Sequence, residues 1–223
     1  MKPVLLVTCS RENNIEKRPI YKSLKKLSSL YSKTEFDYKV ISNNQKGLSE
    51  VYNQFLTTKY KDYIVLFCHD DVVIDNMFLC EFLNKSPYVV TGLAGTKSFT
   101  LKNKPPAWNL MSSRDEHVGE VKHIKDNTVW TTVFGKTTSP AKLIDGLFIS
   151  IDVEKIIKTK ARFNEQFAFH HYDLALCLEC IKHNVNIGIM PISVIHYGLG
   201  DSMLTQEWQI SAKKFIEVYS GVF

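Results

Sequence analysis

The most informative stretch of the chain is Tyr63-Ile-Val-Leu-Phe-Cys-His69-Asp70-Asp71-Val-Val-Ile74. Its first half is a continuous apolar run without helical spacing, which is typical of a strand buried on both faces of a sheet. The run ends in one imidazole and two carboxylates, and carboxylates are rarely buried unless they are paired or bind a metal. Because ligands of open α/β sheets bind beyond the carboxyl ends of the strands, this segment predicts a site at a sheet edge.

The acidic cluster allows two interpretations. Asp is common in turns, so Asp70 and Asp71 can simply end the strand. Alternatively, two carboxylates and the imidazole of His69 can hold a hard divalent cation, which would in turn hold a diphosphate. The other motifs along the chain decide between the turn and the cation site.

Predicted strands and helices alternate along the chain. Residues 21–31 place Leu24, Leu27 and Leu30 on one side of an amphipathic helix. Strands are also predicted at 3–7, 38–41, 64–67, 89–93 and 187–189, helices at 48–57, 76–83 and 173–183, and regular structure at 143–151. This alternation predicts one α/β domain over residues 1–223, with a mostly parallel central sheet and helices on both faces.

Residues 95–140 break the alternation, because they are rich in Pro, Gly, Thr and Lys. A segment of this length is too long for a passive connection, so we expect a functional loop region. Trp108 lies within it. An aromatic side chain in such a loop can stack on a sugar ring or base, or it can be a local hydrophobic anchor, and both interpretations stay open.

Composition limits the class of protein. The chain has 223 residues, 44% of them hydrophobic, which suffices for one large core. No apolar stretch is long enough to span a bilayer, and five scattered cysteines indicate reduced thiols. We therefore expect a cytoplasmic protein, in a bacterial cytosol or a virus-infected host cell. The net charge of +5 fits an anionic ligand such as a sugar nucleotide and permits weak nucleic-acid contact.

Five segments, in chain order, resemble those of nucleotide-sugar glycosyltransferases of the GT-A fold, close to the inverting family-two group. They are Asn43-Asn-Gln-Lys-Gly47-Leu-Ser-Glu-Val-Tyr-Asn53, the segment 63–74, Ile144-Asp145-Gly146-Leu-Phe-Ile-Ser150, residues 163–177, and His196-Tyr-Gly198-Leu-Gly200. The resemblance covers most of the chain. It implies a Rossmann-like GT-A fold, a divalent metal (Mn²⁺ or Mg²⁺), a UDP-sugar donor and inversion at the transferred sugar.

The resemblance also implies the metal ligands. Asp71 lies at the metal-motif position, and His196 matches the late His-x-Gly that often completes the site. His69 departs from the pattern, because the family commonly has Asp there. His69 can be a ligand, a hydrogen-bonding partner behind the ligands, or the packed end of the strand.

Asp173 is the candidate catalytic base. A positioned carboxylate can take the proton of an acceptor hydroxyl, and a place at a helix start favours its ionised form. By residue type and place alone, the N-cap of that helix is the favoured role of Asp173. The resemblance to the family's catalytic segment reverses this and implies the base. The same resemblance places Asp145 and Gly146 on the acceptor side. His170 is expected to contact the acceptor or the backbone, and Tyr172 and Trp108 are further acceptor candidates.

The donor is expected at the exits of the first strands, in the half of the chain formed by residues 1–94. The candidate donor-binding residues are Thr8, Cys9, Ser10, Arg11, Asn43, Asn44, Gly47, Asn53 and Asp70. The glycine pattern is not that of a dinucleotide site. Residues 95–223 form the acceptor-binding and catalytic half.

Three functions remain open from the sequence. The first is a metal-dependent glycosyltransferase that uses a nucleoside-diphosphate sugar and a hydroxyl acceptor, either a glycan or a small molecule. The second is a viral enzyme that glycosylates a hydroxymethylated base in DNA, for which Lys97, Lys102 and Lys104 would contact phosphates. The third is a binding module that has lost catalysis. The sequence specifies neither the sugar nor the oligomeric state.

Overall fold

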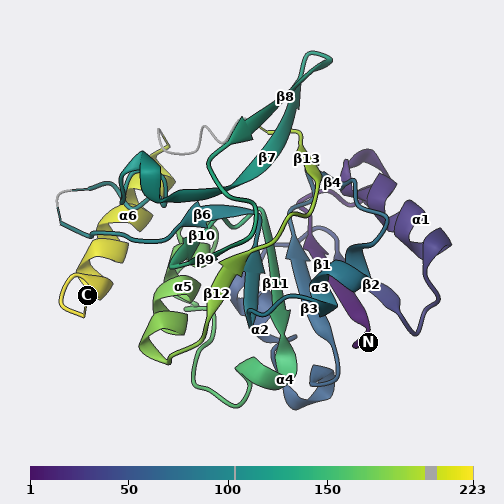
Figure 1. Cartoon of the computed structure of the whole chain (residues 1–223), viewed down its shortest axis with the longest axis horizontal. Coiled ribbons are helices and arrows are strands. Elements are labelled where there is room, and N and C mark those ends of the chain that lie inside the picture. Colours follow the sequence, from purple (N-terminus) through teal and green to yellow (C-terminus); the bar gives the residue numbers. More distant parts are fainter. Residues whose placement is uncertain (103, 199–204, 223) are drawn as a thin grey trace.

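A central seven-stranded sheet forms the body of the molecule (Figure 1). This computed structural model describes residues 1–102, 104–198 and 205–222. The strands follow the order β2 (Phe36–Ile41), β1 (Val4–Cys9), β3 (Ile64–Cys68), β11 (Phe148–Asp152), β5 (Val90–Gly92), β12 (Ile187–Ile189) and β9 (Ser139–Ala141). The pairs β2–β1, β1–β3 and β5–β12 are parallel, whereas β11 and β9 run antiparallel to their neighbours. The predicted α/β class is confirmed, with mixed rather than purely parallel strands.

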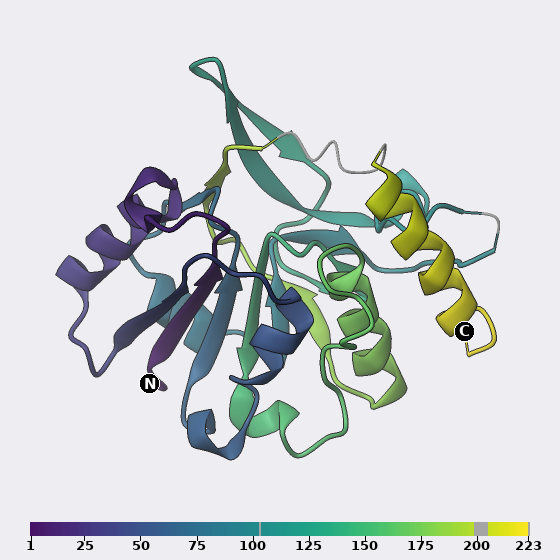
Figure 2. The same ribbon diagram turned by 180° about the vertical axis from the view of Figure 1, so that it is seen from behind.

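Helices cover both faces of this sheet. α1 (Ile20–Leu30) and α3 (Leu79–Asn84) lie on one face, and α2 (Leu48–Asn53) and α5 (Tyr172–Lys182) lie on the other (Figure 2). The predicted helix at 21–31 is confirmed, because α1 buries Leu24 and Leu27 while Leu30 stays exposed. The remaining helices are α4 (Val153–Ile156), α6 (Gln206–Tyr219) and the 3₁₀ turns Ile15–Lys17, Thr58–Tyr60 and Arg114–Glu116. None of the helices in the described ranges is both long and apolar enough to cross a membrane.

A second sheet lies above the carboxyl ends of the parallel strands. Its order is β10 (Leu143–Ile144), β6 (Ala94–Thr96), β7 (His117–Lys125), β13 (Val194–His196) and β4 (Val72–Ile74), and β8 (Thr128–Val133) pairs with β7. The β7–β8 hairpin rises from the body of the molecule (Figure 1). The prediction of a loop region over 95–140 is therefore wrong for the hairpin. Its turn residues Asp126 and Asn127 have φ of 48° and 62°, as a two-residue hairpin turn requires.

The chain passes from one sheet to the other at the acidic cluster. β3 ends at Cys68 in the central sheet, and β4 begins at Val72 in the second sheet. The three residues between them therefore lie where the sheets meet. β13 pairs antiparallel with β4 and sets His196 opposite Val72, which brings the predicted late histidine to the same place.

Candidate active site

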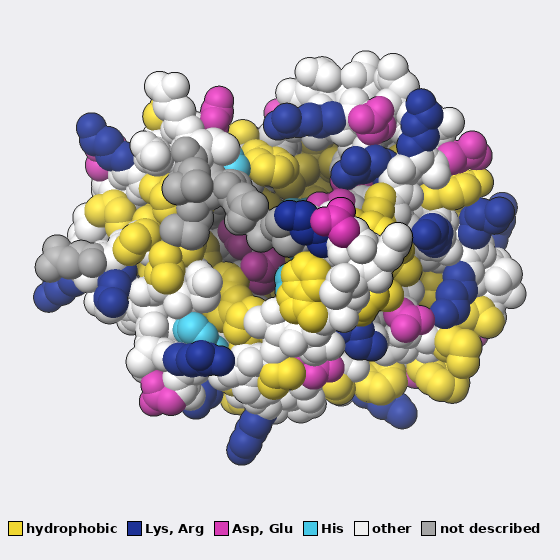
Figure 3. All heavy atoms as spheres, turned by 90° about the horizontal axis from the view of Figure 1, so that it is seen from above, with side chains coloured by type: hydrophobic (Ala, Val, Ile, Leu, Met, Phe, Trp, Pro, Cys, Tyr) yellow, Lys and Arg dark blue, Asp and Glu magenta, His cyan; other side chains and the backbone are white. Residues whose placement is uncertain are grey.

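A cleft of about 700 Å³ opens at the carboxyl ends of β1, β2 and β3. From above, acidic side chains are visible within a hollow of this face, with hydrophobic and basic side chains around it (Figure 3). The predicted residues that line the cleft are Cys9, Ser10, Arg11, Asn44, Gly47, His69, Asp70 and Asp71. The cleft therefore combines the exits of the first three strands, as the sequence predicts.

Three predicted donor residues do not line this cleft. Thr8 is fully buried in β1, and Asn43 occupies a left-handed turn with φ of 49°. The amide of Asn53 is held by the backbone of Phe163, to which it donates at 2.9 Å and from which it accepts at 3.0 Å. Asn53 thus fixes residues 163–165 against α2, and this role replaces the predicted donor contact.

Arg18 is a cleft residue that the sequence analysis missed. Its guanidinium lies 2.9 Å from Asp70, and this hydrogen bond raises the pKa of Arg18. Its Nε is buried without a hydrogen-bond partner. The backbone N–H of Ile20 also donates to the carbonyl of Asp70 at 3.1 Å. The start of α1 is therefore docked on the exit of β3, a contact between distant segments that no local pattern reveals.

Phe169 is one of several side chains that line the cleft without having been predicted. The guanidinium of Arg11 lies 5.6 Å from the ring centre of Phe169, which is 47% exposed. The other unpredicted lining residues include Glu12, Gln45, Lys46, Leu48 and Tyr52. The cleft therefore offers cationic groups beside an exposed aromatic ring.

Asp71 and His196 form the innermost polar pair. His196 Nε2 lies 3.3 Å from one carboxylate oxygen of Asp71, while the other oxygen is buried without a partner. Burial acts to raise the pKa of Asp71, but the hydrogen bond with His196 and nearby positive charge outweigh it and lower that pKa. A Cβ on Gly198 would lie 2.8 Å from His196 Nε2, so glycine leaves room for the imidazole. Gly200 lies outside the described residues.

His69 is oriented by Tyr172, which in turn contacts Gly146. Its Nε2 lies 2.9 Å from the hydroxyl of Tyr172, and that hydroxyl donates to the carbonyl of Gly146 at 2.7 Å. A hydroxyl has one proton, so it accepts from His69, and Nε2 must carry the hydrogen. Burial lowers the pKa of His69, which favours the neutral ring. Nε2 is thus unavailable to a metal. Tyr172 is itself buried, which corrects its predicted contact with the acceptor.

Asp173 lies in the first turn of α5, next to Asp145 and Gly146. The N-cap of this helix is His171, with φ of 62°, so the alternative interpretation of Asp173 as the N-cap is wrong. Burial and then the negative charge of Asp145 raise the pKa of Asp173 to about 7, although backbone hydrogen bonds at the helix start oppose this. A carboxylate with such a pKa is matched to proton transfer at neutral pH.

Trp108 is an anchor for Asp145. It is buried, with 7% of its surface exposed, and its indole nitrogen donates to Asp145 at 2.9 Å. The second oxygen of Asp145 accepts from the backbone of Leu147 at 2.9 Å. Of the two interpretations of Trp108, the structure therefore favours the hydrophobic anchor.

The two histidines before Tyr172 connect α5 to α6. The Oγ of Ser211 donates to the carbonyl of His170 at 3.1 Å and lies 2.8 Å from Nδ1 of His171. His170 is half-buried and does not line the cleft, and burial lowers its pKa. Its contact with an acceptor remains a prediction.

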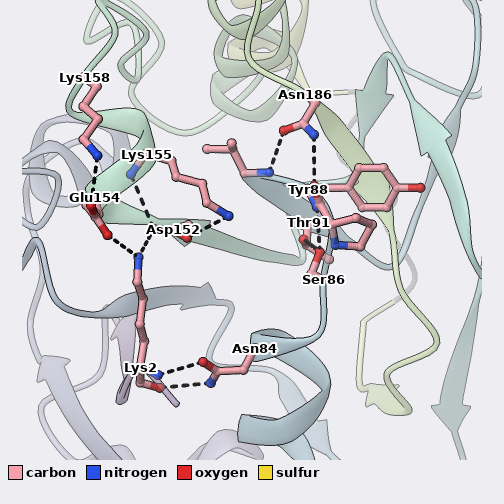
Figure 4. Close-up of polar contacts among 12 residues, drawn as sticks. Lys2, Asn84, Ser86, Tyr88, Thr91, Asp152, Glu154, Lys155, Lys158 and Asn186 are labelled. Atoms are coloured by element: carbon pink, nitrogen blue, oxygen red, sulfur yellow. Dashed lines mark hydrogen bonds and ion pairs between the residues drawn. The ribbon is translucent and has the colours of Figure 1, made fainter.

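A second hollow, of about 290 Å³, lies at the opposite end of the central sheet. Lys2 pairs there with Asp152 and Glu154, and Lys155 pairs with Asp152 (Figure 4). These charges satisfy one another, in contrast to the unpartnered oxygen of Asp71. The cleft at the carboxyl ends is therefore the candidate active site.

The model of the Glycosyltransferase like family matches residues 5–219. The chain belongs to this family. The catalytic class is thus that of a glycosyltransferase, acting on a nucleotide-sugar donor and an acceptor. A search of curated proteins gave no match.

Two solved structures are similar to the chain at low identity. A197 from STIV is 14% identical with a TM-score of 0.47, over 88% of this chain and 86% of that one. The inositol-1-phosphate CTP transferase from T. maritima is 9% identical with a TM-score of 0.41, over 97% of this chain and 98% of that one. At these TM-scores the family assignment rests on the family model alone.

Proposed function

We propose that this glycosyltransferase binds a UDP-sugar in the cleft and transfers the sugar, with inversion, to an acceptor hydroxyl. Ser10 and Asn44 line the part of the cleft where the uridine would lie. The amide of Asn44 is bonded at both ends to the backbone of Lys46, so it would shape this part of the cleft through the turn that it holds. Arg11, Arg18 and Lys46 offer cations to the diphosphate. Inversion and the uridine rest on the resemblance of the sequence segments to the inverting group.

The observation that carries the proposal is the carboxylate of Asp71. One of its oxygens is buried without a partner, and the other contacts His196 at 3.3 Å. Asp71 and His196 would hold Mn²⁺ or Mg²⁺. The described part of the chain contains no group of three or more His, Cys, Asp or Glu poised for a metal. Mg²⁺-type ions are commonly held by one or two carboxylates together with waters and substrate phosphates. Asp71 and His196 therefore fit such an ion without a third protein ligand. The bound cation would neutralise charge on the departing phosphate.

Asp173 and the residues next to it, Asp145 and Gly146, would act on the acceptor. Asp173 would take the proton of the attacking hydroxyl, which its pKa of about 7 permits near neutral pH. Asp145 holds that pKa up by its charge, and Trp108 holds Asp145 in place. The bonds from His69 to Tyr172 and on to Gly146 would align the donor and acceptor halves.

Asp71→Asn tests the metal and donor assignment. We expect the variant to fold normally and to lose Mn²⁺-dependent UDP binding by a factor of 10 or more, since an amide removes the charge that attracts the cation. Titration calorimetry with UDP, with and without Mn²⁺, measures this. The matched control is Asp75→Asn, because Asp75 is exposed and forms a surface ion pair with Lys26. Full turnover of an EDTA-treated enzyme would exclude the metal.

A further inference from the structure

The β7–β8 hairpin carries a pair of stacked rings. His123 and Trp130 are direct cross-strand partners, and such partners lie on the same face of a sheet. Their ring centres are 5.5 Å apart with an interplanar angle of 20°. Trp130 is nevertheless 38% exposed, so a rigid indole is held at the surface.

This ring pair is continuous with the candidate active site. β13 sets His196 beside His123, and the two rings are 5.6 Å apart at 61°. His196 in turn contacts Asp71 at 3.3 Å. Three successive side-chain contacts therefore lead from Trp130 to the carboxylate that would hold the metal. Figures 1 and 2 show that the β7–β8 hairpin rises on the side of the molecule where the parallel strands of the central sheet have their carboxyl ends.

We propose that Trp130, backed by His123, is a platform on which an uncharged sugar ring of the acceptor stacks. This inference rests on the proposed function and names the acceptor as a neutral glycan. The C–H face of a pyranose is apolar and flat enough to pack on an indole. Because His123 already fixes the indole, little side-chain entropy is lost when the sugar binds.

The charge of the hairpin favours a neutral glycan over a nucleic acid. Between His117 and Val133 the two cations, Lys122 and Lys125, are balanced by Glu120 and Asp126. Lys122 is moreover engaged by Ser193 at 2.9 Å. A nucleic-acid surface needs an excess of Lys and Arg that replaces counterions. Outside the hairpin, Lys97, predicted as a phosphate contact, lies 3.8 Å from Glu116.

The opposite face of the same strand supplies a control. Side chains alternate along β8, so Val129 points away from the face of Trp130. Val129 is also exposed, at 53%. Val129→Ala therefore removes exposed apolar surface from the hairpin without touching the ring pair.

NMR titration of the indole N–H signals tests the platform without a donor. The chain has three tryptophans, and the spectrum of Trp130→Phe identifies the signal of Trp130. The probes are maltohexaose, cellohexaose, chitohexaose and a 12-base-pair DNA duplex. We expect the Trp130 signal to shift with at least one oligosaccharide. Trp130→Ala should then weaken that binding 10-fold or more, whereas Val129→Ala should leave it within 2-fold.

The outcomes separate this inference from the proposed function. A Trp130 signal that no oligosaccharide moves would overturn the platform, as would a shift with DNA alone that vanishes at high salt. UDP affinity in the presence of Mn²⁺, measured on the same samples, judges the donor site independently. If Trp130→Ala fails to fold, Trp130→Leu keeps the apolar volume and removes the aromatic face, and undiminished oligosaccharide binding by it would equally overturn the platform.

Discussion

Asp173 is the residue whose chemistry depends most on its surroundings. Its pKa is raised to about 7 by burial and by Asp145, whereas an ordinary aspartate titrates near 3.9. The group therefore keeps its proton up to neutral pH and accepts one only above it. Carboxyl groups with such a raised pKa are concentrated at sites of proton transfer in enzymes.

The rate of transfer should follow the ionised fraction of Asp173. We expect kcat to rise about 10-fold per pH unit below pH 7 and to level above it. Asp173→Asn should lower kcat on the order of 10²-fold or more and leave UDP affinity within 2-fold. The control is Asp62→Asn, because Asp62 is exposed at the other end of β3. Near wild-type kcat in Asp173→Asn would exclude the base role.

The same raised pKa predicts a pH-dependent stability. Between about pH 4 and pH 7 the unfolded chain releases the proton of Asp173 while the folded chain keeps it, so this group makes the wild type less stable as pH rises. Asp173→Asn lacks this penalty. Its melting temperature should match that of the wild type at pH 4 and exceed it at pH 8. A constant difference across this range would contradict the assigned pKa.

The place of a residue in the cleft was predictable where it lies close behind the end of a strand. Ser10 follows β1 directly and Asp71 lies three residues after β3, and both line the cleft. Arg18 was not predictable, because only the docking of α1 on β3 brings it to Asp70. Asn53 was misplaced for a related reason, since its partner Phe163 lies 110 residues away in the chain.

At the scale of elements, Gly146 sets the approach of α5 to the strands before it. A Cβ at this position would lie 2.6 Å from the Tyr172 hydroxyl and 3.1 Å from the Cβ of Asp173. Gly146→Ala should therefore displace both side chains, destabilise the fold by about 1–3 kcal/mol and lower kcat. Denaturant unfolding and turnover measure this. Gly221→Ala is the control, because a Cβ at Gly221 has no atom within 4 Å; equal behaviour of the two variants would contradict the close approach.

β1 and β3 of the central sheet were predictable because burial on both faces makes their sequences almost continuously apolar. The β7–β8 hairpin was not, because β8 is almost entirely exposed and its Thr-Val-Trp-Thr-Thr-Val sequence carries no core pattern. β4 and β13 are only three residues each. Such strands are defined by their partners rather than by their own sequence, so the second sheet emerged only from the structure.

Across the whole molecule, the two ends of the central sheet differ in how their charged groups are paired. The carboxyl ends of the parallel strands hold the cleft, where one oxygen of Asp71 and the Nε of Arg18 lack a hydrogen-bond partner. The opposite end is closed by ion pairs around Asp152 (Figure 4). Asp152 joins Lys2 at 2.6 Å to Lys155 at 3.2 Å and also caps α4. The network thus ties the N-terminus of the chain to β11 and α4.

Asp152→Asn should therefore reduce stability without affecting the active site. Burial acts to raise the pKa of Asp152, but Lys2 and Lys155 outweigh it and lower that pKa. The stabilisation is present above the unfolded pKa near 3.9 and is lost as pH falls through the lower folded value. We expect the variant to lose on the order of 1–2 kcal/mol at pH 7 and to approach the wild type below pH 4. Urea unfolding at pH 7 and below pH 4 measures this loss of stability. UDP affinity should stay unchanged, because the ion pairs of Asp152 lie at the opposite end of the sheet from the cleft. A deficit as large in acid as at pH 7 would show that the carboxylate charge of Asp152 is not its source.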